Sequence, residues 1–159
     1  MNPPERKSKK YYSTQEALLA LQRYCAYQDR CHQEVRSKLL SMGIYGDDLE
    51  QIIVHLIEDK FLDEERFARS YARGKFRIKK WGRLRIVQEL KKRQVSAYCI
   101  RKALEEIDPT EYEATLTEVL RGKMATATGD DFTRRQKALQ YAMRKGYEIE
   151  LAREAIEKL

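Results

Sequence analysis

Basic side chains crowded into one stretch are the residues of this sequence that could do chemistry. Between Arg69 and Arg93 the chain holds eleven lysines and arginines and one acid, Glu89, so the segment carries +10 in a protein whose total is +7. The first twelve residues add +3, and the remainder therefore sums to −6. Concentrated positive charge raises both encounter rate and affinity for polyanions. The segment therefore predicts a surface that binds nucleic-acid phosphates or an acidic protein.

The same segment predicts a helix with two faces. Apolar and small residues recur at helical spacing and predict a buried face: Phe67, Tyr71, Gly74 and Ile78. Basic residues recur in the same way and form a second stripe: Arg66, Arg69, Arg73, Arg77 and Lys80. The candidate binding residues are this stripe together with Lys79, Arg83, Arg85 and Lys92. Trp81 could stack a nucleobase or pack at the junction of two helical units, and packing is favoured.

Two other groups of residues raise the question of catalysis or metal binding. Asp63 and the acids after it lack a His, Cys or Ser partner in sequence, so we interpret them as an N-cap and first-turn acids that complement the helix dipole. Cys31 and His32 are adjacent, but no second pair lies at metal-ligand spacing. Nucleotide-binding glycine motifs are missing as well. The sequence therefore predicts no catalytic site, no metal and no cofactor.

Cysteine usage and hydropathy bear on the compartment. The three cysteines cannot all pair within the chain and form no CxxC motif, which favours free thiols in the cytoplasm. No apolar run approaches the roughly 20 residues that span a bilayer. Residues 1–12 lack the apolar core of a signal peptide and are predicted to form a disordered basic arm. We expect a cytoplasmic protein that does not enter membranes.

Start and stop signals divide the chain into nine predicted helices, and no strand-like alternation appears, so the predicted fold class is all-α. Gly43 and Gly146 are expected to end two of the helices in the left-handed conformation. The residues expected to cap helix N-termini are Ser13, Asp47 or Asp48, Asp63, Ser96, Asp108, and Asp130 or Asp131.

The predicted helices repeat along the chain. The pair Leu39 and Ile44 has counterparts 51 and then 52 further residues along, at Leu90 and Val95 and at Ala142 and Tyr147. Three units follow, 13–60, 61–108 and 109–159, each of three helices. Such small units gain stability from their neighbours, so they are predicted to stack into an elongated, curved array. Gln94 stands where the other units have glycine, and the second unit is therefore predicted to end that helix differently.

Several motifs resemble the RecX family, bacterial regulators of the RecA recombinase. FLDEERFA at residues 61–68, followed by Tyr71, is similar to the family signature, and residues 82–90 resemble its next motif of a glycine, basic residues and Ile-x-x-Glu-Leu. The first unit, with Arg30, Glu34 and Gly43, and the third unit, with Gly146 before Tyr147, also fit the family pattern. The departures are Cys31, where a small hydroxyl residue is usual, and Gln94, where glycine is common.

The resemblance implies tandem three-helix units and a non-enzymatic modulator, mainly an inhibitor, that binds the RecA–DNA filament. It implies restraint of strand exchange, ATP turnover and co-protease activity in recombination, DNA repair and the SOS response. We expect a monomer that meets DNA, single- or double-stranded, as part of that complex. The alternative is a helical module that binds DNA or RNA directly. A nuclease is third, since a carboxylate-rich metal constellation is missing.

Overall fold

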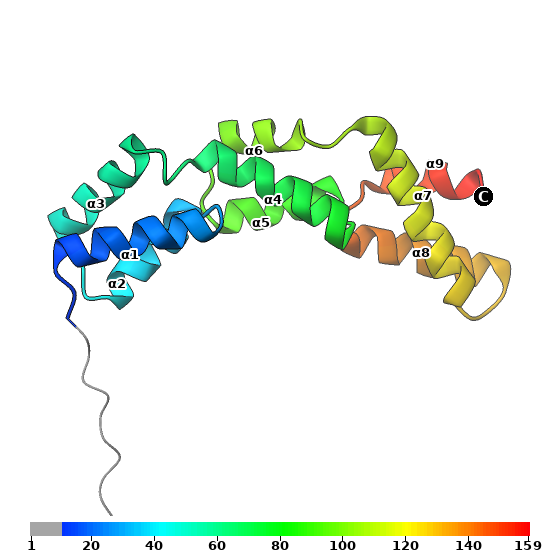
Figure 1. The fold of residues 1–159 in the computed structure, drawn as a ribbon. Coiled ribbons are helices and arrows are strands. Elements are labelled where there is room, and N and C mark those ends of the chain that lie inside the picture. The colour runs from blue at the N-terminus through cyan, green and yellow to red at the C-terminus, as the bar shows by residue number, and fades with distance from the viewer. Residues whose placement is uncertain (1–10) are drawn as a thin grey trace, which may run out of the picture. The chain divides into compact units, whose positions relative to one another are not determined.

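The computed structural model describes residues 11–159, and these residues form nine α-helices without a strand (Figure 1). The predicted all-α class is therefore confirmed. The first ten residues of the predicted basic arm lie outside the described residues. The helices are α1 (Thr14–Tyr27), α2 (His32–Ser41), α3 (Gly46–Glu58), α4 (Glu64–Lys79), α5 (Arg83–Lys92), α6 (Ala97–Leu104), α7 (Pro109–Thr126), α8 (Asp131–Lys145) and α9 (Ile149–Glu157).

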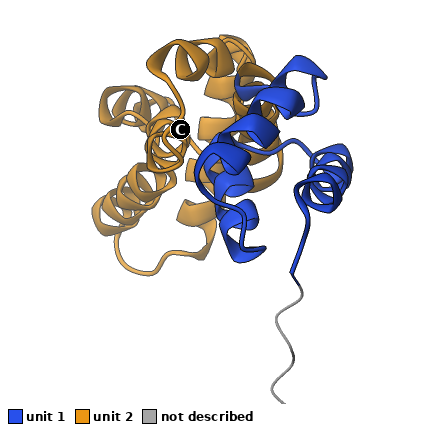
Figure 2. Cartoon of the chain, turned by 90° about the vertical axis from the view of Figure 1, so that its left-hand side faces the viewer, with its two compact units in different colours: residues 1–64 blue, residues 65–159 orange. Residues whose placement is uncertain are grey.

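The chain divides into two compact units. The first ends at Glu64 and contains α1 to α3, and the second runs from Glu65 to Leu159 and contains α4 to α9 (Figure 2). None of the helices in residues 11–159 is both long and apolar enough to cross a bilayer. The three-way division of the sequence and its stacking into an elongated, curved array stay predictions.

The first unit has a core of its own, contributed by all three helices. Leu21, Leu39 and Leu56, one from each helix, are fully buried. Cys25 is buried in the same core. Cys31 precedes α2 as its N-cap residue, and its buried thiol donates to Glu34 Oε1 at 3.4 Å rather than capping the helix backbone.

Most of the predicted N-caps are confirmed. The side chains of Ser13, Ser96, Asp108 and Asp130 each accept a hydrogen bond from the backbone N–H three residues later, at 2.8 to 3.2 Å. The prediction of Asp47 or Asp48 as the cap of α3 is wrong, because that helix begins earlier, with Tyr45 at the N-cap. The two aspartates lie in the first turn instead, where their charge complements the helix dipole.

The helices α2, α5 and α8, which occupy equivalent places in the predicted repeat, end in the same way. Ile44, Val95 and Tyr147 each donate a backbone N–H to the carbonyl five residues earlier, at 3.0 to 3.1 Å, which is the longer bond of a Schellman motif. Gln94 adopts a φ of 59°, close to the left-handed region that glycine favours. The prediction of a different ending for the second unit is therefore wrong. The left-handed conformation of Gln94 costs about 1 kcal/mol. Burial of Val95 and the backbone hydrogen bonds that Gln94 and Val95 donate offset this cost.

The predicted buried face of α4 is correct for its first part only. Phe67 is buried and Tyr71 half-buried, but Ile78 is 79% exposed. The core-facing side chains of this helix are Phe67, Ala68, Ala72 and Phe76. Ile78 follows Phe76 by two residues and therefore lies on nearly the opposite side of the helix. The prediction missed Ala68, Ala72 and Phe76, which recur every four residues along the buried face.

In the second unit, a close backbone contact joins Gly82, between α4 and α5, to Gly146, at the end of α8. Gly82 donates its N–H to the Lys145 carbonyl at 2.7 Å, and Leu84 donates to the Gly146 carbonyl at 3.0 Å. A Cβ on Gly82 would lie 2.3 Å from the carbonyl carbon of Gly146, and one on Gly146 would lie 2.4 Å from Arg85 Cβ. Both positions therefore require glycine, and Gly146 also has a φ of 101°.

Two buried tyrosines reinforce this contact. Tyr147 donates its phenol to the Lys80 carbonyl at 2.7 Å, and Tyr112 donates to Glu148 Oε1 at 2.9 Å while it accepts from the Arg83 N–H at 3.1 Å. Their ring centroids lie 5.1 Å apart. Burial raises the pKa of both phenols, so they stay protonated and act as donors at neutral pH. These contacts thus join the segment that links α4 to α5 to α7, to the end of α8 and to the start of α9.

We predict that Gly82→Ala lowers the free energy of unfolding of this unit by about 3 kcal/mol or more, because the new methyl group overlaps backbone atoms that cannot move independently. Gly122→Ala is the matched control. Gly122 is exposed in α7 with nothing near the position of a Cβ, so alanine there should stabilise the helix by about 1 kcal/mol. Urea denaturation followed by circular dichroism measures both changes. Equal effects from the two substitutions would show that the glycine contact does not hold the unit together.

Candidate protein and nucleic-acid interface

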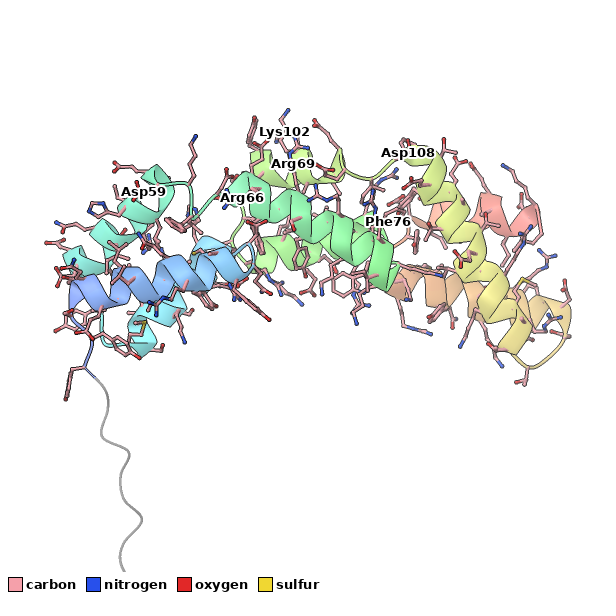
Figure 3. All side chains as sticks on the ribbon, viewed as in Figure 1. Asp59, Arg66, Arg69, Phe76, Lys102 and Asp108 are labelled. Carbon is pink, nitrogen blue, oxygen red and sulfur yellow. The ribbon has the colours of Figure 1, made fainter. Side chains whose placement is uncertain are left out.

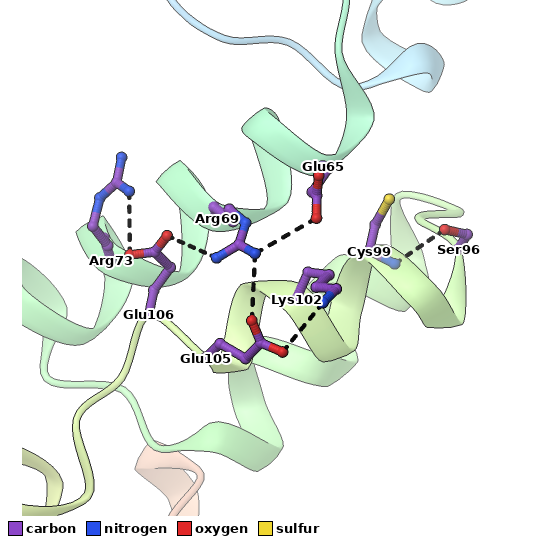
Figure 4. A network of polar contacts seen from close by, with 8 residues as sticks. All are labelled: Glu65, Arg69, Arg73, Ser96, Cys99, Lys102, Glu105 and Glu106. Carbon is purple, nitrogen blue, oxygen red and sulfur yellow. Dashed lines mark hydrogen bonds and ion pairs between the residues drawn. The ribbon is translucent and has the colours of Figure 1, made fainter.

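The first half of the predicted basic stripe belongs to an internal ion-pair network. Arg69 donates to Glu106 Oε1 at 3.0 Å and lies 3.4 Å from Glu105 and 3.5 Å from Glu65 (Figure 4). Arg73 lies 3.3 Å from the other oxygen of Glu106. The hydrogen bond from Arg69 lowers the pKa of Glu106, which keeps that carboxylate charged. Arg69 and Arg73 therefore connect α4 to the segment just after α6 (Figure 4).

Three further candidate residues also have internal acid partners. Lys80 Nζ lies 2.7 Å from Glu118, and Arg83 lies 3.2 Å from Glu148 with its guanidinium 3.9 Å from the Tyr112 ring centroid. Lys92 pairs with Glu89 at 3.3 Å within α5. Exposed pairs of this kind contribute little to stability, but they reduce the charge that a partner would meet. The formal charge of the segment thus overstates its capacity to bind polyanions.

The unpaired cations lie around the last turn of α4 and the first turn of α5. Among the residues that the structure describes, no carboxylate lies within ion-pair distance of Lys75, Arg77, Lys79 or Arg85. Arg77 and Lys79 are exposed, whereas Lys75 and Arg85 are half-buried. Arg66, also a predicted binding residue, is exposed near the start of α4, away from this group (Figure 3).

Aromatic rings position the two half-buried cations. Arg85 holds its guanidinium carbon 4.2 Å from the Trp81 ring centroid, and Lys75 Nζ lies 5.0 Å from it. Trp81 meets Tyr71 edge-on at 6.5 Å between ring centroids. Cation–π contacts orient a positive charge without neutralising it, unlike the ion pairs of Arg69. Of the two interpretations of Trp81, packing therefore agrees with the structure.

An exposed apolar side chain accompanies these charges. Ile78 lies between Arg77 and Lys79 on the last turn of α4. We call the group formed by Lys75, Arg77, Ile78, Lys79, Trp81 and Arg85 the α4–α5 corner. It combines unneutralised positive charge, an isolated apolar contact point and cations fixed by aromatic rings. Such a surface suits a partner that offers both acidic groups and apolar area.

The structure therefore shows that the nine predicted binding residues do not all offer free positive charge to a partner. Arg77, Lys79 and Arg85 belong to the α4–α5 corner and have no ion pair among the described residues, whereas Arg69, Arg73, Lys80, Arg83 and Lys92 make internal contacts. Sequence reasoning missed Lys75 and Ile78 as members of the region. The aromatic residues at positions 71 and 81 are the sequence feature that could have indicated Lys75. The apolar stripe with which Ile78 was grouped pointed to burial rather than exposure. In residues 11–159 no three His, Cys, Asp or Glu side chains gather in a way that could hold a metal ion.

Comparisons with known proteins agree with the helical repeat. Residues 63–104 match the family model described as the second three-helix domain of RecX, and residues 111–156 match the third. The chain is similar to a solved RecX structure from Lactobacillus salivarius, with a TM-score of 0.82 at 22% identity over 92% of this chain and 96% of that one. A second structure, of regulatory protein RecX, gives a TM-score of 0.83 at 20% identity over 91% of this chain and 73% of that one. These likenesses show the fold.

Sequence relatives bear the same name. The chain is 27% identical to regulatory protein RecX of Prosthecochloris aestuarii, over 92% of this chain and 95% of the relative. It is 30% identical to regulatory protein RecX of Salmonella heidelberg, over 79% and 80%. It spans a smaller share, 52%, of the relative from Lactococcus lactis. With two matched domains and these relatives, the chain belongs to the RecX family of regulatory proteins.

Proposed function

We propose that this chain is a modulator, mainly an inhibitor, of RecA that binds the RecA–DNA filament. Bound there, it restrains strand exchange, ATP turnover and co-protease activity. The names of its relatives support a regulatory role. RecA as the regulated partner is what the motifs at residues 61–71 and 82–90 imply. The observation that carries the proposal is the α4–α5 corner, where unpaired cations surround an exposed apolar side chain.

The mode of action that fits this corner is occupancy rather than catalysis. A RecA–DNA filament offers both phosphates and folded protein surface, which the mixed character of the corner suits. Binding there excludes incoming duplex and other proteins by sterics, and no bond in the partner needs to change. The three cysteines are buried and form no disulfide with one another, which fits action in the bacterial cytoplasm. We expect the chain to act as a monomer.

The first test reverses charge at the corner. Arg77→Glu with Lys79→Glu should lower affinity for RecA filaments on single-stranded DNA by about tenfold or more, because attraction becomes repulsion at an otherwise unneutralised surface. Helix content should not change, since both side chains are exposed and make no internal ion pair. Co-sedimentation with the filament measures the affinity.

The matched control is Arg23→Glu with Arg153→Glu, which alters net charge equally at two exposed positions far along the sequence from the corner. This variant should bind within about threefold of the parent, because distant exposed charges are largely screened. Equal losses in the two double variants would show that the filament senses net charge alone, and the corner would not be the binding surface.

The second test uses salt to separate the filament from bare DNA as the target. If phosphates supply most of the affinity, binding falls with a log–log slope near −0.9 for each phosphate neutralised on duplex DNA. Apolar contact is not screened in this way, so binding to RecA-coated DNA should persist at salt concentrations that abolish binding to bare DNA. Fluorescence anisotropy over a salt series measures the affinity for bare DNA and for RecA-coated DNA. Parallel slopes without preference for coated DNA would favour the module that binds nucleic acid directly.

A further inference from the structure

A second cationic site lies next to the α4–α5 corner, where α7 and α8 meet the end of α4. A groove of about 400 Å³ runs between α7 and α8, and Lys80, Lys123 and Lys145 line it together with Tyr141. Glu118 is the only acid in its lining, and it pairs with Lys80. Residues 109–159 as a whole contain nine basic and nine acidic residues, so composition does not explain this local surplus of positive charge.

Two of the lysines are arranged around the aromatic ring. Lys123 Nζ lies 5.1 Å from the Tyr141 ring centroid, and Lys145 Nζ lies 5.6 Å from it. Lys145 also donates to the Lys79 carbonyl at 2.8 Å, which fixes its ammonium at the end of the groove. Neither ammonium has a carboxylate partner among the described residues. The site therefore presents two oriented positive charges beside a half-buried ring.

Gly122 keeps the groove open. It is exposed within α7, where glycine costs helix stability relative to alanine, and no atom lies within 4 Å of the position of a Cβ. Packing inside the protein therefore does not require glycine there. The missing side chain leaves space in the groove beside Lys123, so that a ligand can approach the helix backbone.

From this geometry we infer that the groove binds one nucleotide of a single nucleic-acid strand, with the phosphate on Lys123 and Lys145 and the base against Tyr141. The volume falls in the range of small-ligand sites. Aromatic rings beside cations are the usual means of holding single strands without sequence preference. The inference does not rest on RecA as partner, and bare oligonucleotide tests it.

The test measures binding of the full chain to a fluorescein-labelled oligothymidylate of about 12 nucleotides by anisotropy. Tyr141→Ala should weaken binding by about fivefold or more, and Tyr141→Phe, which keeps the ring, should restore it. Gly122→Leu should weaken binding to a similar extent because it fills the groove. Lys123→Gln should weaken binding more than its control Arg121→Gln, an exposed neighbour on α7 that does not line the groove.

Competitors and photocrosslinking identify the ligand and the site. An abasic strand of equal length should compete less well than the oligothymidylate, and free thymidine monophosphate should compete only at high concentration. Ultraviolet crosslinking should attach thymine to the peptide that contains Tyr141. The inference is overturned if the abasic strand or polyglutamate competes as well as the oligothymidylate, if both glutamine variants lose equally, or if the crosslinks lie only at other peptides.

Discussion

The second compact unit depends on one contact, the approach of Gly82 to Gly146. Two backbone hydrogen bonds form there only because neither residue carries a side chain. The contact holds the start of α5 against the end of α8, and the phenols of Tyr112 and Tyr147 complete the junction. Both proposed surfaces depend on it, since Trp81 precedes Gly82, Arg85 lies in the first turn of α5, and Lys145 precedes Gly146.

The positive charge of this chain has two roles that only the structure separates. Arg69 and Arg73 meet carboxylates just after α6, Arg83 meets Glu148 at the start of α9, and these ion pairs connect helices within the unit. Lys75 and Arg85 rest on aromatic rings instead and keep their full charge. An arginine facing a glutamate and an arginine facing a tryptophan look alike in a count of charges, but only the second offers a net positive potential to a partner.

The sequence supported the fold well because its signals are local. Capping residues such as Ser96 and Asp108 and the left-handed glycines at 43 and 146 bond to backbone groups within a few positions, so their spacing alone indicates helix ends. Gln94 shows the limit of this reasoning. A glutamine disfavours the left-handed conformation, but hydrogen bonds and the burial of Val95 stabilise it there.

The candidate surface could be predicted only in part, because it depends on contacts between residues far apart in sequence. The stripe from Arg66 to Lys80 was found by its spacing, but the neutralisation of Arg69 comes from Glu105 and Glu106, more than thirty positions away. The exposure of Ile78 depends on which face of α4 packs against the rest of the unit. The groove beside Tyr141 joins residues from three segments, and no motif in the sequence marks it.

The central claim is that the α4–α5 corner, rather than the whole basic segment, meets the RecA–DNA filament. Lysine acetylation read by mass spectrometry tests it directly, with the protein free and bound to the filament. The account predicts that Lys79 loses reactivity on binding, whereas Lys137 and Lys158, in the third helical unit, stay reactive. Unchanged labelling of Lys79 in the bound protein, or protection spread evenly over all three lysines, would contradict it.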